Sequence, residues 1–438
     1  MLNKVRSYIH KHHLLDSGKY ILALSGGADS VCLLRMMLSM GYDVDAVHCN
    51  FKLRGEESER DEQFCVSLCH THGVTLHRVH FDTKEYASLH KISIEMAARE
   101  LRYNYFEQLR KALDAEGILV AHHRDDNIET VLLNIIRGTG IRGLEGIKPR
   151  NGFILRPLLC LSRSEILSYL DSIQQDYITD SSNMVADVQR NKIRLNLIPA
   201  IQDILPSATD NIANTISHVS EAVKVYDDSI RRSISLCFKD STIDLEILSQ
   251  QPSPEAVLHE ILSPLGFNSV QVQQIFSSLS TAQPGKIWQS DSHLLAMDRG
   301  TLVVGKPIAP LPTILLPECG NYRYADDRFT ISLETSSYSG PHDISRHPHI
   351  ATLDADRVEF PLTIRPVQPA DRFSPYGMNG CKLVSDYLTD CKRNYFQRQG
   401  QLVLCDASGD ILWLVGERVS AHAAITTDTI NMLRIRYY

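Results

Sequence analysis

Short apolar runs alternate with longer amphipathic segments over the first 150 residues of the chain. The apolar runs, rich in aliphatic and β-branched residues, predict β-strands over residues 20–24, 44–47, 74–79 and 118–121. The amphipathic segments predict helices over residues 30–40, 56–72, 93–115 and 126–137. Strands that alternate with helices are typical of a parallel sheet with crossover helices. We therefore expect a doubly wound α/β domain, in which ligands bind beyond the carboxyl ends of the strands.

The pattern becomes helical after about residue 206. A long helix is predicted over residues 211–233 and further helix over 254–279. A hairpin of residues 286–289 and 294–304, turning through Asp298-Arg299-Gly300, follows. Prolines at positions 307, 310, 312 and 317 indicate a linker. Beyond it, short strands accompany one basic helix near residues 384–397. The expected organisation is a doubly wound parallel-sheet domain over residues 1–205, a small mainly helical domain over 206–306, a linker over 307–319 and an α+β domain over 320–438.

The composition is that of a folded globular protein. Its 438 residues suggest two or three domains, and 43% hydrophobic with 22% charged residues exclude a disordered chain or a coiled coil. No apolar run approaches the roughly 18 residues of a membrane span, and the first 20 residues lack the apolar stretch of a signal peptide. We therefore expect a cytoplasmic protein without a membrane partner. Its ten cysteines are expected to be reduced thiols.

Charge is unevenly distributed along the chain. The net charge of −7 argues against indiscriminate binding of nucleic acid. Two basic stretches stand out from this background: Arg137, Arg142, Lys148, Arg150, Arg156 and Arg163 in the first, and Arg365, Arg372, Lys382, Lys392, Arg393 and Arg398 in the second. Aromatic residues are interleaved with the second stretch. Solvated faces often have this composition, but two such stretches in an acidic protein favour a polyanionic partner.

A candidate phosphate-binding loop follows the first predicted strand. It reads Ser25-Gly26-Gly27-Ala28-Asp29-Ser30 and leads directly into a helix. Glycines permit a tight turn there, and the N–H groups at a helix N-terminus point at an anion. The loop lacks the lysine of a Walker motif, so it is not expected to hold a transferring γ-phosphate. A carboxylate beside phosphates requires a bridging cation, so Asp29 predicts Mg²⁺ together with ATP.

Polar residues also follow two other predicted strands, at residues 48–54 and 122–127. Parallel strands end at the same edge of a sheet, so these segments are expected to lie beside the phosphate-binding loop. Asp125 and Asp126 stand at the start of a helix. Two adjacent acids in this place could cap the helix, bind Mg²⁺ or hold an ammonium group, and the sequence leaves these alternatives open.

The motifs together resemble the N-type ATP pyrophosphatases, or PP-loop family, and within it the tRNA(Ile)-lysidine synthetases. Beyond the loop, the resemblance rests on His48-Cys49-Asn50-Phe51-Lys52-Leu53-Arg54, on the spacing of Glu95, Arg99, Arg102, Tyr103 and Phe106, and on Ala121 to Thr130 with Gly138-Thr139-Gly140. It extends to Arg156-Pro157-Leu158-Leu159, Asp180-Ser181-Ser182-Asn183, Arg190-Asn191-Lys192-Ile193-Arg194, Asp371-Arg372-Phe373 and Lys382 to Leu388. Where many members of the family have a second histidine, this chain has Phe51, and Asp180 replaces a common glutamate.

The resemblance implies a defined reaction. ATP adenylates the C2 oxygen of the wobble cytidine in the CAU anticodon of an isoleucine tRNA, and pyrophosphate leaves. The amine of free lysine then displaces AMP to form lysidine. The implied cofactors are ATP and Mg²⁺, and the implied partners are that tRNA and lysine. A homodimer is compatible with the resemblance, while the sequence leaves the oligomeric state open.

Site residues follow from the same resemblance. The implied catalytic residues are Asp29, Arg102, Asp125, Asp126 and Arg194, with Asp29 and Asp126 as metal ligands. The implied ATP-binding residues are Ser25, Gly26, Gly27, Ala28, Asp29, Ser30, His48, Asn50, Arg99 and His122. The residues expected to bind lysine or tRNA are Arg54, Glu129, Arg137, Arg142, Arg372, Lys382, Lys392 and Arg393. The base that deprotonates lysine could be a carboxylate, His122 or His123.

Two other functions are weighed against this one. A PP-loop tRNA thiolase also adenylates a base, but it needs cysteines that carry sulfur or bind an iron–sulfur cluster, and this chain has no Cys-x-x-Cys pair. An ATP-sensing or tRNA-binding protein without turnover is the second alternative. The intact loop from Ser25 to Ser30 and the two acids make it less attractive.

Overall fold

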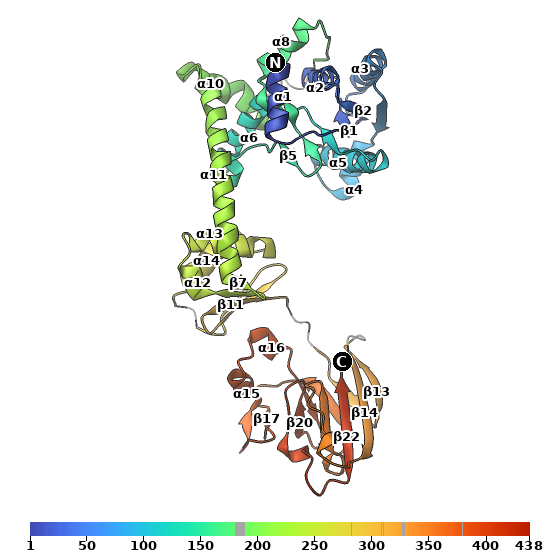
Figure 1. Ribbon diagram of the computed structural model, residues 1–438, viewed down its shortest axis with the longest axis vertical. Helices are drawn as coiled ribbons and strands as arrows, with labels where there is room; N and C mark the ends of the chain where they lie inside the picture. Colours follow the sequence, from blue (N-terminus) through green and yellow to red (C-terminus); the bar gives the residue numbers. More distant parts are fainter. Residues whose placement is uncertain (180–188, 282, 308, 310, 326–328, 379) are drawn as a thin grey trace. The chain divides into compact units, whose positions relative to one another are not determined.

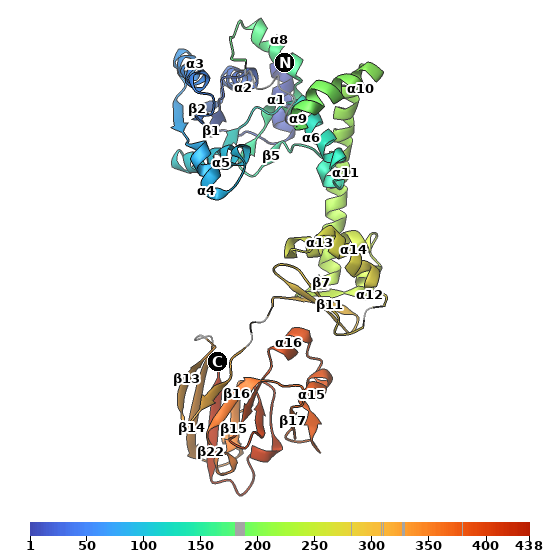
Figure 2. The same ribbon diagram turned by 180° about the vertical axis from the view of Figure 1, so that it is seen from behind.

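The computed structural model describes residues 1–179, 189–281, 283–307, 309, 311–325, 329–378 and 380–438. The predicted motif at residues 180–183 and the linker residue Pro310 lie outside the described residues. The chain forms two compact units, Met1–Asp227 and Asp228–Tyr438 (Figure 1, Figure 2). No helix in the described ranges is both long enough and apolar enough to cross a membrane.

The first unit contains a six-stranded sheet with the strand order β3-β2-β1-β4-β6-β5. Its strands are β1 (Lys19–Ala23), β2 (Asp43–Asn50), β3 (Leu76–His80), β4 (Gly117–Leu119), β5 (Arg150–Asn151) and β6 (Ile154–Leu155). Neighbouring strands run parallel except for the β5–β6 pair. Because β1 lies between β2 and β4, the winding direction reverses beside β1, as expected for a doubly wound sheet. The predicted α/β class is confirmed.

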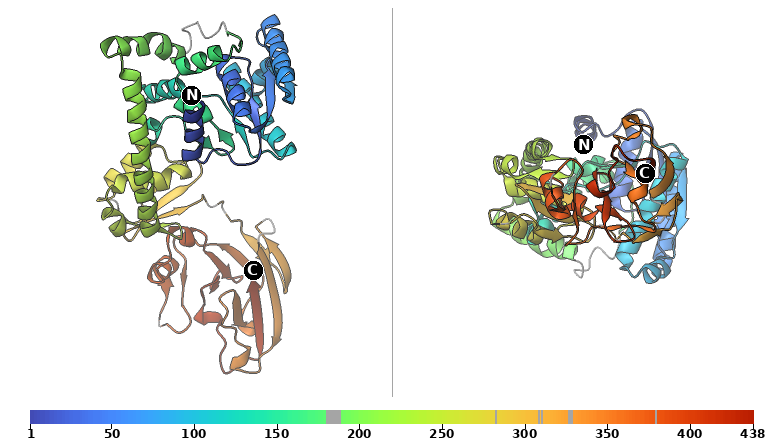
Figure 3. Two further views of the ribbon diagram at one scale, coloured as in Figure 1. Left: turned by 45° about the horizontal axis from the view of Figure 1, so that its top comes forward. Right: turned by 90° about the horizontal axis from the view of Figure 1, so that it is seen from below.

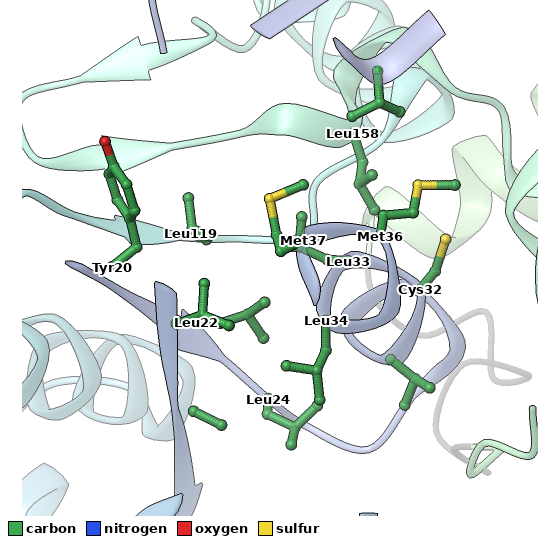
Figure 4. Close-up of a cluster of buried hydrophobic side chains, with 14 of the residues drawn as sticks. Tyr20, Leu22, Leu24, Cys32, Leu33, Leu34, Met36, Met37, Leu119 and Leu158 are labelled. Carbon is green, nitrogen blue, oxygen red and sulfur yellow. The ribbon is translucent and has the colours of Figure 1, made fainter. Parts of the chain in front are cut away.

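Helices cover both faces of this sheet. The helices of the first unit are α1 (Leu2–Lys11), α2 (Ala28–Ser39), α3 (Glu56–His72), α4 (Thr83–His90), α5 (Ile94–Ala112), α6 (Arg124–Ile136), α7 (Ile141–Leu144), α8 (Arg163–Ser172), α9 (Gln189–Lys192) and α10 (Ile198–Ile204). The side chains of β1 alternate between the faces, as strand geometry dictates. Leu22 packs with Leu33 and Met37 of α2 (Figure 4), whereas Ile21 packs on the other face with Phe106 of α5. This double burial explains the continuous apolar run of the strand.

A 30-residue helix, α11 (Ala208–Cys237), leads into the strands of the second unit (Figure 1, Figure 3). There, the helices α12 (Leu245–Ser249), α13 (Pro254–Leu262) and α14 (Ser269–Ser278) accompany a sheet of β7 (Phe238–Lys239), β8 (Thr242–Asp244), β9 (Ile287–Gln289), β10 (Leu294–Asp298) and β11 (Thr301–Gly305). Strands β10 and β11 form the predicted hairpin, with partners Asp298 and Thr301 at its turn. The helical stretch predicted over residues 254–279 is divided into α13 and α14.

The remainder of the second unit is built from antiparallel strands. One sheet contains β12 (Ile314–Leu316), β16 (Leu362–Pro366), β19 (Leu402–Cys405), β20 (Ile411–Leu414) and β21 (Arg418–Val419). A second contains β13 (Gly320–Tyr324), β14 (Phe329–Ser337), β15 (Ile350–Asp354) and β22 (Asn431–Tyr437), and β17 (Arg372–Phe373) pairs with β18 (Lys382–Leu383). Buried side chains of the first two sheets, among them Ile364, Leu404, Leu333 and Leu433, form a shared core.

The prediction of one continuous basic helix near residues 384–397 is wrong. The segment forms two short helices, α15 (Val384–Asp390) and α16 (Tyr395–Gln399). Lys392 between them has a φ of +57°, a left-handed conformation that ends a helix. Asn394 then starts α16 through a capping box with Gln397. Lys392 and Arg393 therefore lie in a turn.

Candidate active site at the carboxyl edge of the parallel sheet

The predicted phosphate-binding loop connects β1 to α2. Gly26 has a φ of +89°, and a Cβ atom added there would lie 2.9 Å from the Cδ1 atom of Ile178. The backbone N–H of Ile178 donates to the carbonyl oxygen of Gly26 at 2.9 Å. This position therefore requires glycine, both for the backbone conformation and for the close neighbour. Gly27 has a φ of −71° and precedes the first turn of α2, whose N–H groups are free of intrahelical partners.

Two serine hydroxyls brace the loop from within. The Oγ atom of Ser30 donates to the carbonyl oxygen of Gly27 at 3.0 Å and accepts the N–H of Ser25 at 3.2 Å. The hydroxyls of Ser25 and Ser30 lie 3.1 Å apart, and the N–H of Gly27 points at the Ser25 hydroxyl at 3.4 Å. These bonds hold the loop in shape without a ligand. Such preorganisation lowers the cost of ordering the loop when an anion binds.

A cavity of about 560 Å³ opens beside this loop. Its lining includes these predicted site residues: Ser25, Asp29, Ser30, His48, Asn50, Arg54, Arg99, Arg102, His122 and Asp126. They come from the ends of β1 and β2, from the starts of α2 and α6, and from α5, and these segments meet at one edge of the sheet. The remaining candidates of this unit do not line the cavity: Gly26, Gly27, Ala28, Asp125, Glu129, Arg137, Arg142 and Arg194.

Two arginines of α5 bring positive charge to the cavity. The guanidinium of Arg99 lies 4.8 Å from the ring centre of Tyr103, and that of Arg102 lies 5.0 Å from the ring centre of Phe51. Within the described ranges, no carboxylate forms an ion pair with either arginine. Aromatic faces position a guanidinium without neutralising it. Both charges are therefore available to an anionic ligand.

The two predicted metal ligands flank a buried histidine. The Nε2 atom of His123 lies 3.8 Å from Oδ1 of Asp29 and 3.5 Å from Oδ2 of Asp126. Burial alone would raise the pKa of Asp126, but the nearby charges of His123 and Arg190 lower the pKa below its usual value. Asp29 also forms an ion pair with Arg163. Ionised carboxylate oxygens lining one cavity are the ligand type that Mg²⁺ prefers, so the residues fit this ion.

Glu129 does not line the cavity and is held in an arginine clamp. Its side chain is 1% exposed and accepts hydrogen bonds from Arg190 Nε at 2.8 Å, Arg194 Nε at 2.6 Å and Arg194 Nη2 at 3.0 Å. Both arginines also contact Oδ1 of Asp126, at 3.1 and 3.4 Å. Burial alone would lower the pKa of Arg194, but its bonds to Glu129 raise that pKa. Both carboxylate oxygens of Glu129 are therefore already bound within the protein.

The other candidates of the first unit lie farther from the loop. Asp125 accepts the backbone N–H of Arg163 at 3.0 Å through Oδ2, which ties α6 to the start of α8. Arg137 donates to Gln189 at 2.9 Å. Arg142 forms an ion pair with Asp227 at 2.8 Å. Each of these side chains thus has a partner within the described part of the unit.

The basic candidates of the second unit differ in exposure. Arg372 and Lys392 are exposed, whereas Lys382 pairs with Asp390 and Arg393 pairs with Glu417. A neighbouring arginine of the same stretch, Arg365, forms a bidentate ion pair with Asp371 at 2.7 and 2.8 Å. Only part of the positive charge in this stretch is therefore free of a carboxylate partner.

His123, a candidate base from the sequence, lies between the two acids. Three other residues with direct contacts to the site were not predicted as site residues: Arg163 on Asp29, Arg190 on Glu129, and Arg156, which donates to His122. Arg156 and Arg190 belong to motifs of the family resemblance, so these motifs could have identified both as site residues. Arg163 had no such signal beyond its place in a basic stretch, because its partner Asp29 is 134 positions away.

Two models of known protein families match parts of this chain. Residues 2–201 match the model of the PP-loop domain, and residues 239–308 match that of the TilS substrate binding domain. The solved structure of the U34-tRNA thiolase NcsA from Methanococcus maripaludis is 17% identical, with a TM-score of 0.42 over 50% of this chain and 78% of the other.

Full-length relatives are far more similar. The tRNA(Ile)-lysidine synthase of Bacteroides thetaiotaomicron is 44% identical over 431 residues, covering 98% of each chain. That of Parabacteroides distasonis is 42% identical over 445 residues, covering 100% of each chain. Because these matches run from end to end, the chain belongs to the tRNA(Ile)-lysidine synthase family.

Proposed function

We propose that this protein is a ligase that joins free lysine to C2 of the wobble cytidine in the CAU anticodon of an isoleucine tRNA. The observation that carries the proposal is the cavity beside the Ser25–Ser30 loop, which combines a preformed anion cradle, two carboxylates and two arginines that have no acidic partner among the described residues. The relatives named tRNA(Ile)-lysidine synthase support the choice of acceptor.

The first step transfers an adenylyl group. The C2 oxygen of the cytidine attacks the α-phosphorus of ATP, and the bond to pyrophosphate breaks. The loop N–H groups donate hydrogen bonds to the departing pyrophosphate. Arg99 and Arg102, which line the cavity, stabilise the charge that develops at the α-phosphate. Asp29 and Asp126 would hold Mg²⁺, which when bound neutralises phosphate charge. Arg194 is bound to Glu129 and also contacts Oδ1 of Asp126, so it helps to orient Asp126.

The second step forms the carbon–nitrogen bond. The lysine amine attacks C2, the C2–oxygen bond breaks, and AMP leaves with that oxygen. The amine must first lose a proton, from a group whose ordinary pKa is about 10.4, to a base beside the cavity. Carboxylates near the cavity attract the ammonium form, and Asp126 is the acid whose pKa is lowered and which lines the cavity. Asp125 lies next to it at the start of α6.

A thiolase activity is less well supported. Cys49 lines the cavity, but burial raises the pKa of its thiol to about 12, so it is not a thiolate at neutral pH. Within the described residues, the cluster of three or more histidine, cysteine or acidic side chains close enough to share a metal ion is Asp406, Asp410 and His422, and it contains no cysteine. A sulfur-carrying or cluster-binding role therefore lacks suitable residues at this site.

The tRNA would contact basic residues of both units. We assign this role to Arg54, Arg137 and Arg142 in the first unit, and to Arg372, Lys382, Lys392 and Arg393 in the second. The division into an adenylating domain over residues 1–205, a helical domain over 206–306 and a tRNA-binding domain over 320–438 is part of this proposal. A homodimer is compatible with it.

A reconstituted reaction tests the proposal. Purified protein is given ATP, Mg²⁺, labelled lysine and an isoleucine tRNA with a CAU anticodon, and both AMP release and lysine incorporation are measured. We expect both, and we expect Asp29→Ala to abolish AMP release while tRNA binding persists. Asp43→Ala is the control, since Asp43 is exposed and outside the cavity. Binding of tRNA without incorporation, or transfer of sulfur, would contradict the proposal.

A further inference from the structure

His122 has a buried partner on one side of its ring. The Nε atom of Arg156 donates to Nδ1 of His122 at 3.2 Å. Arg156 itself is only 7% exposed, and its Nη1 atom donates to the carbonyl oxygen of Lys148 at 2.8 Å. The guanidinium is therefore held from two sides. His122 in turn lines the cavity, together with Ser25 and Arg99.

This contact determines where the imidazole carries its proton. An arginine Nε–H can only donate, so Nδ1 of His122 must accept and cannot bear hydrogen. A neutral imidazole with an unprotonated Nδ1 carries its proton on Nε2. Protonation of Nδ1 would place two N–H groups against each other and two positive charges side by side.

We propose that Arg156 is a positioning residue that holds His122 as the neutral Nε2–H tautomer. In this form His122 is a hydrogen-bond donor to an anionic oxygen bound in the cavity, such as a phosphate oxygen of the nucleotide. This role rests on the proposed use of ATP. It also means that His122 does not accept the proton from lysine, a role that the sequence alone left open.

The surroundings of His122 agree with this assignment. Burial lowers the pKa of His122 to about 4, the charge of Asp126 opposes this shift, and the charges of Arg156 and Arg190 reinforce it. Burial also lowers the pKa of Arg156, but an arginine retains its charge at neutral pH. The proton acceptor is therefore to be sought among the carboxylates and His123, and the imidazole of His122 serves binding.

Nitrogen NMR on the full-length protein with ¹⁵N-labelled histidine tests the proposal, because protonated and unprotonated ring nitrogens have separate chemical shifts. The His122 signals are assigned by their loss in His122→Asn. In the unmodified protein at pH 7, without ligands, we expect an unprotonated Nδ1 and a protonated Nε2. A proton on Nδ1, or an imidazolium, would overturn the proposal.

Two substitutions separate positioning from folding. Arg156→Met keeps much of the side-chain volume but removes the donor, and should give a mixture of the two tautomers. Arg150→Met is the matched control, because Arg150 donates to the backbone oxygens of His13 and Leu14, away from His122, and should leave the His122 signals unchanged. An unchanged single tautomer in Arg156→Met refutes the positioning role. If Arg156→Met does not fold, the spectrum of the unmodified protein still tests the proposal, because a proton on Nδ1 of His122 would refute it.

The function of the site is measured separately. ATP affinity should fall at least fivefold in Arg156→Met, whereas an unchanged affinity would contradict the donor role of His122. These measurements do not depend on turnover. An Nε2–H tautomer with tight ATP binding but no lysine incorporation would refute the proposed function and leave the assignment of His122 standing.

Discussion

The arginine clamp on Glu129 offers a quantitative test of how the site is held together. The side chain of Glu129 is 1% exposed and is bound by Arg190 and Arg194. Glu129→Gln keeps the shape of this side chain but removes its charge. Breaking a fully buried ion pair costs about 3–5 kcal/mol. Here the two arginine side chains are 37% and 35% exposed and keep Asp126 as a partner, which reduces the loss. We expect a cost of about 2 kcal/mol, typical of hydrogen bonds to charged groups.

Hydrogen exchange measured by mass spectrometry resolves this loss locally. A cost of about 2 kcal/mol corresponds to roughly thirtyfold faster exchange of the amides of α6, provided that exchange follows local opening. The control is Glu221→Gln on α11, whose partner is Lys224 and whose side chain is 63% exposed. An exposed pair of this kind is worth less than about 1 kcal/mol.

Exchange of the α6 amides should therefore be clearly faster in Glu129→Gln than in Glu221→Gln. If Glu129→Gln changes exchange of α6 by no more than the control does, the clamp does not stabilise the site, and the reasoning from burial fails. A loss confined to α11 would point to the same conclusion. An effect of the expected size in α6, with native exchange in β1 and α2, supports a local role.

Three further predictions concern the loop, an aromatic contact and acid stability. Gly26→Ala should destabilise the first unit by at least about 1 kcal/mol because of its positive φ, whereas Gly27→Ala should fold normally and lose ATP affinity; urea unfolding and calorimetric titration distinguish them. Phe51→Leu removes the ring that faces Arg102 and should weaken ATP binding about two- to fivefold, as expected for a cation–π contact of about 0.5–1 kcal/mol; equal affinities would show that the ring does not orient the guanidinium. Burial alone would raise the pKa of Asp371. Hydrogen bonds from its arginine partner and from a backbone N–H together have the larger, opposite effect, so the pKa lies below the usual 3.8. The ion pair therefore stabilises the fold above about pH 4 and is lost as the pH falls below that value, so Asp371→Asn should lower stability at pH 7 and flatten the acid limb of a pH series of urea midpoints.

Much of the fold could be predicted from local patterns. The apolar run that became β1 and the glycines that follow it define strand, loop and helix within a short stretch of sequence. The predicted single basic helix does not form because the backbone at Lys392 takes a left-handed conformation, which ends the first helix. The capping box of Asn394 and Gln397 was a local signal for the break.

The contacts that complete the site could not be predicted in this way. Arg156 and His122 are 34 positions apart, and Arg163 and Asp29 are 134 positions apart, so only the packing of β6 and α8 brings them together. Nothing local distinguishes such an arginine from a solvated one. For the same reason, the sequence could not show that both oxygens of Glu129 are bound by arginines.

The central claim is that this protein builds lysidine at one nucleotide of one tRNA. Nucleoside mass spectrometry of the reacted tRNA tests this most directly, with a methionine tRNA carrying the same anticodon as the control. The account predicts that the wobble cytidine of the isoleucine tRNA is converted to lysidine, with one AMP released for each lysine incorporated. An unmodified cytidine, a sulfur-containing nucleoside or lysine attached at another position would contradict it.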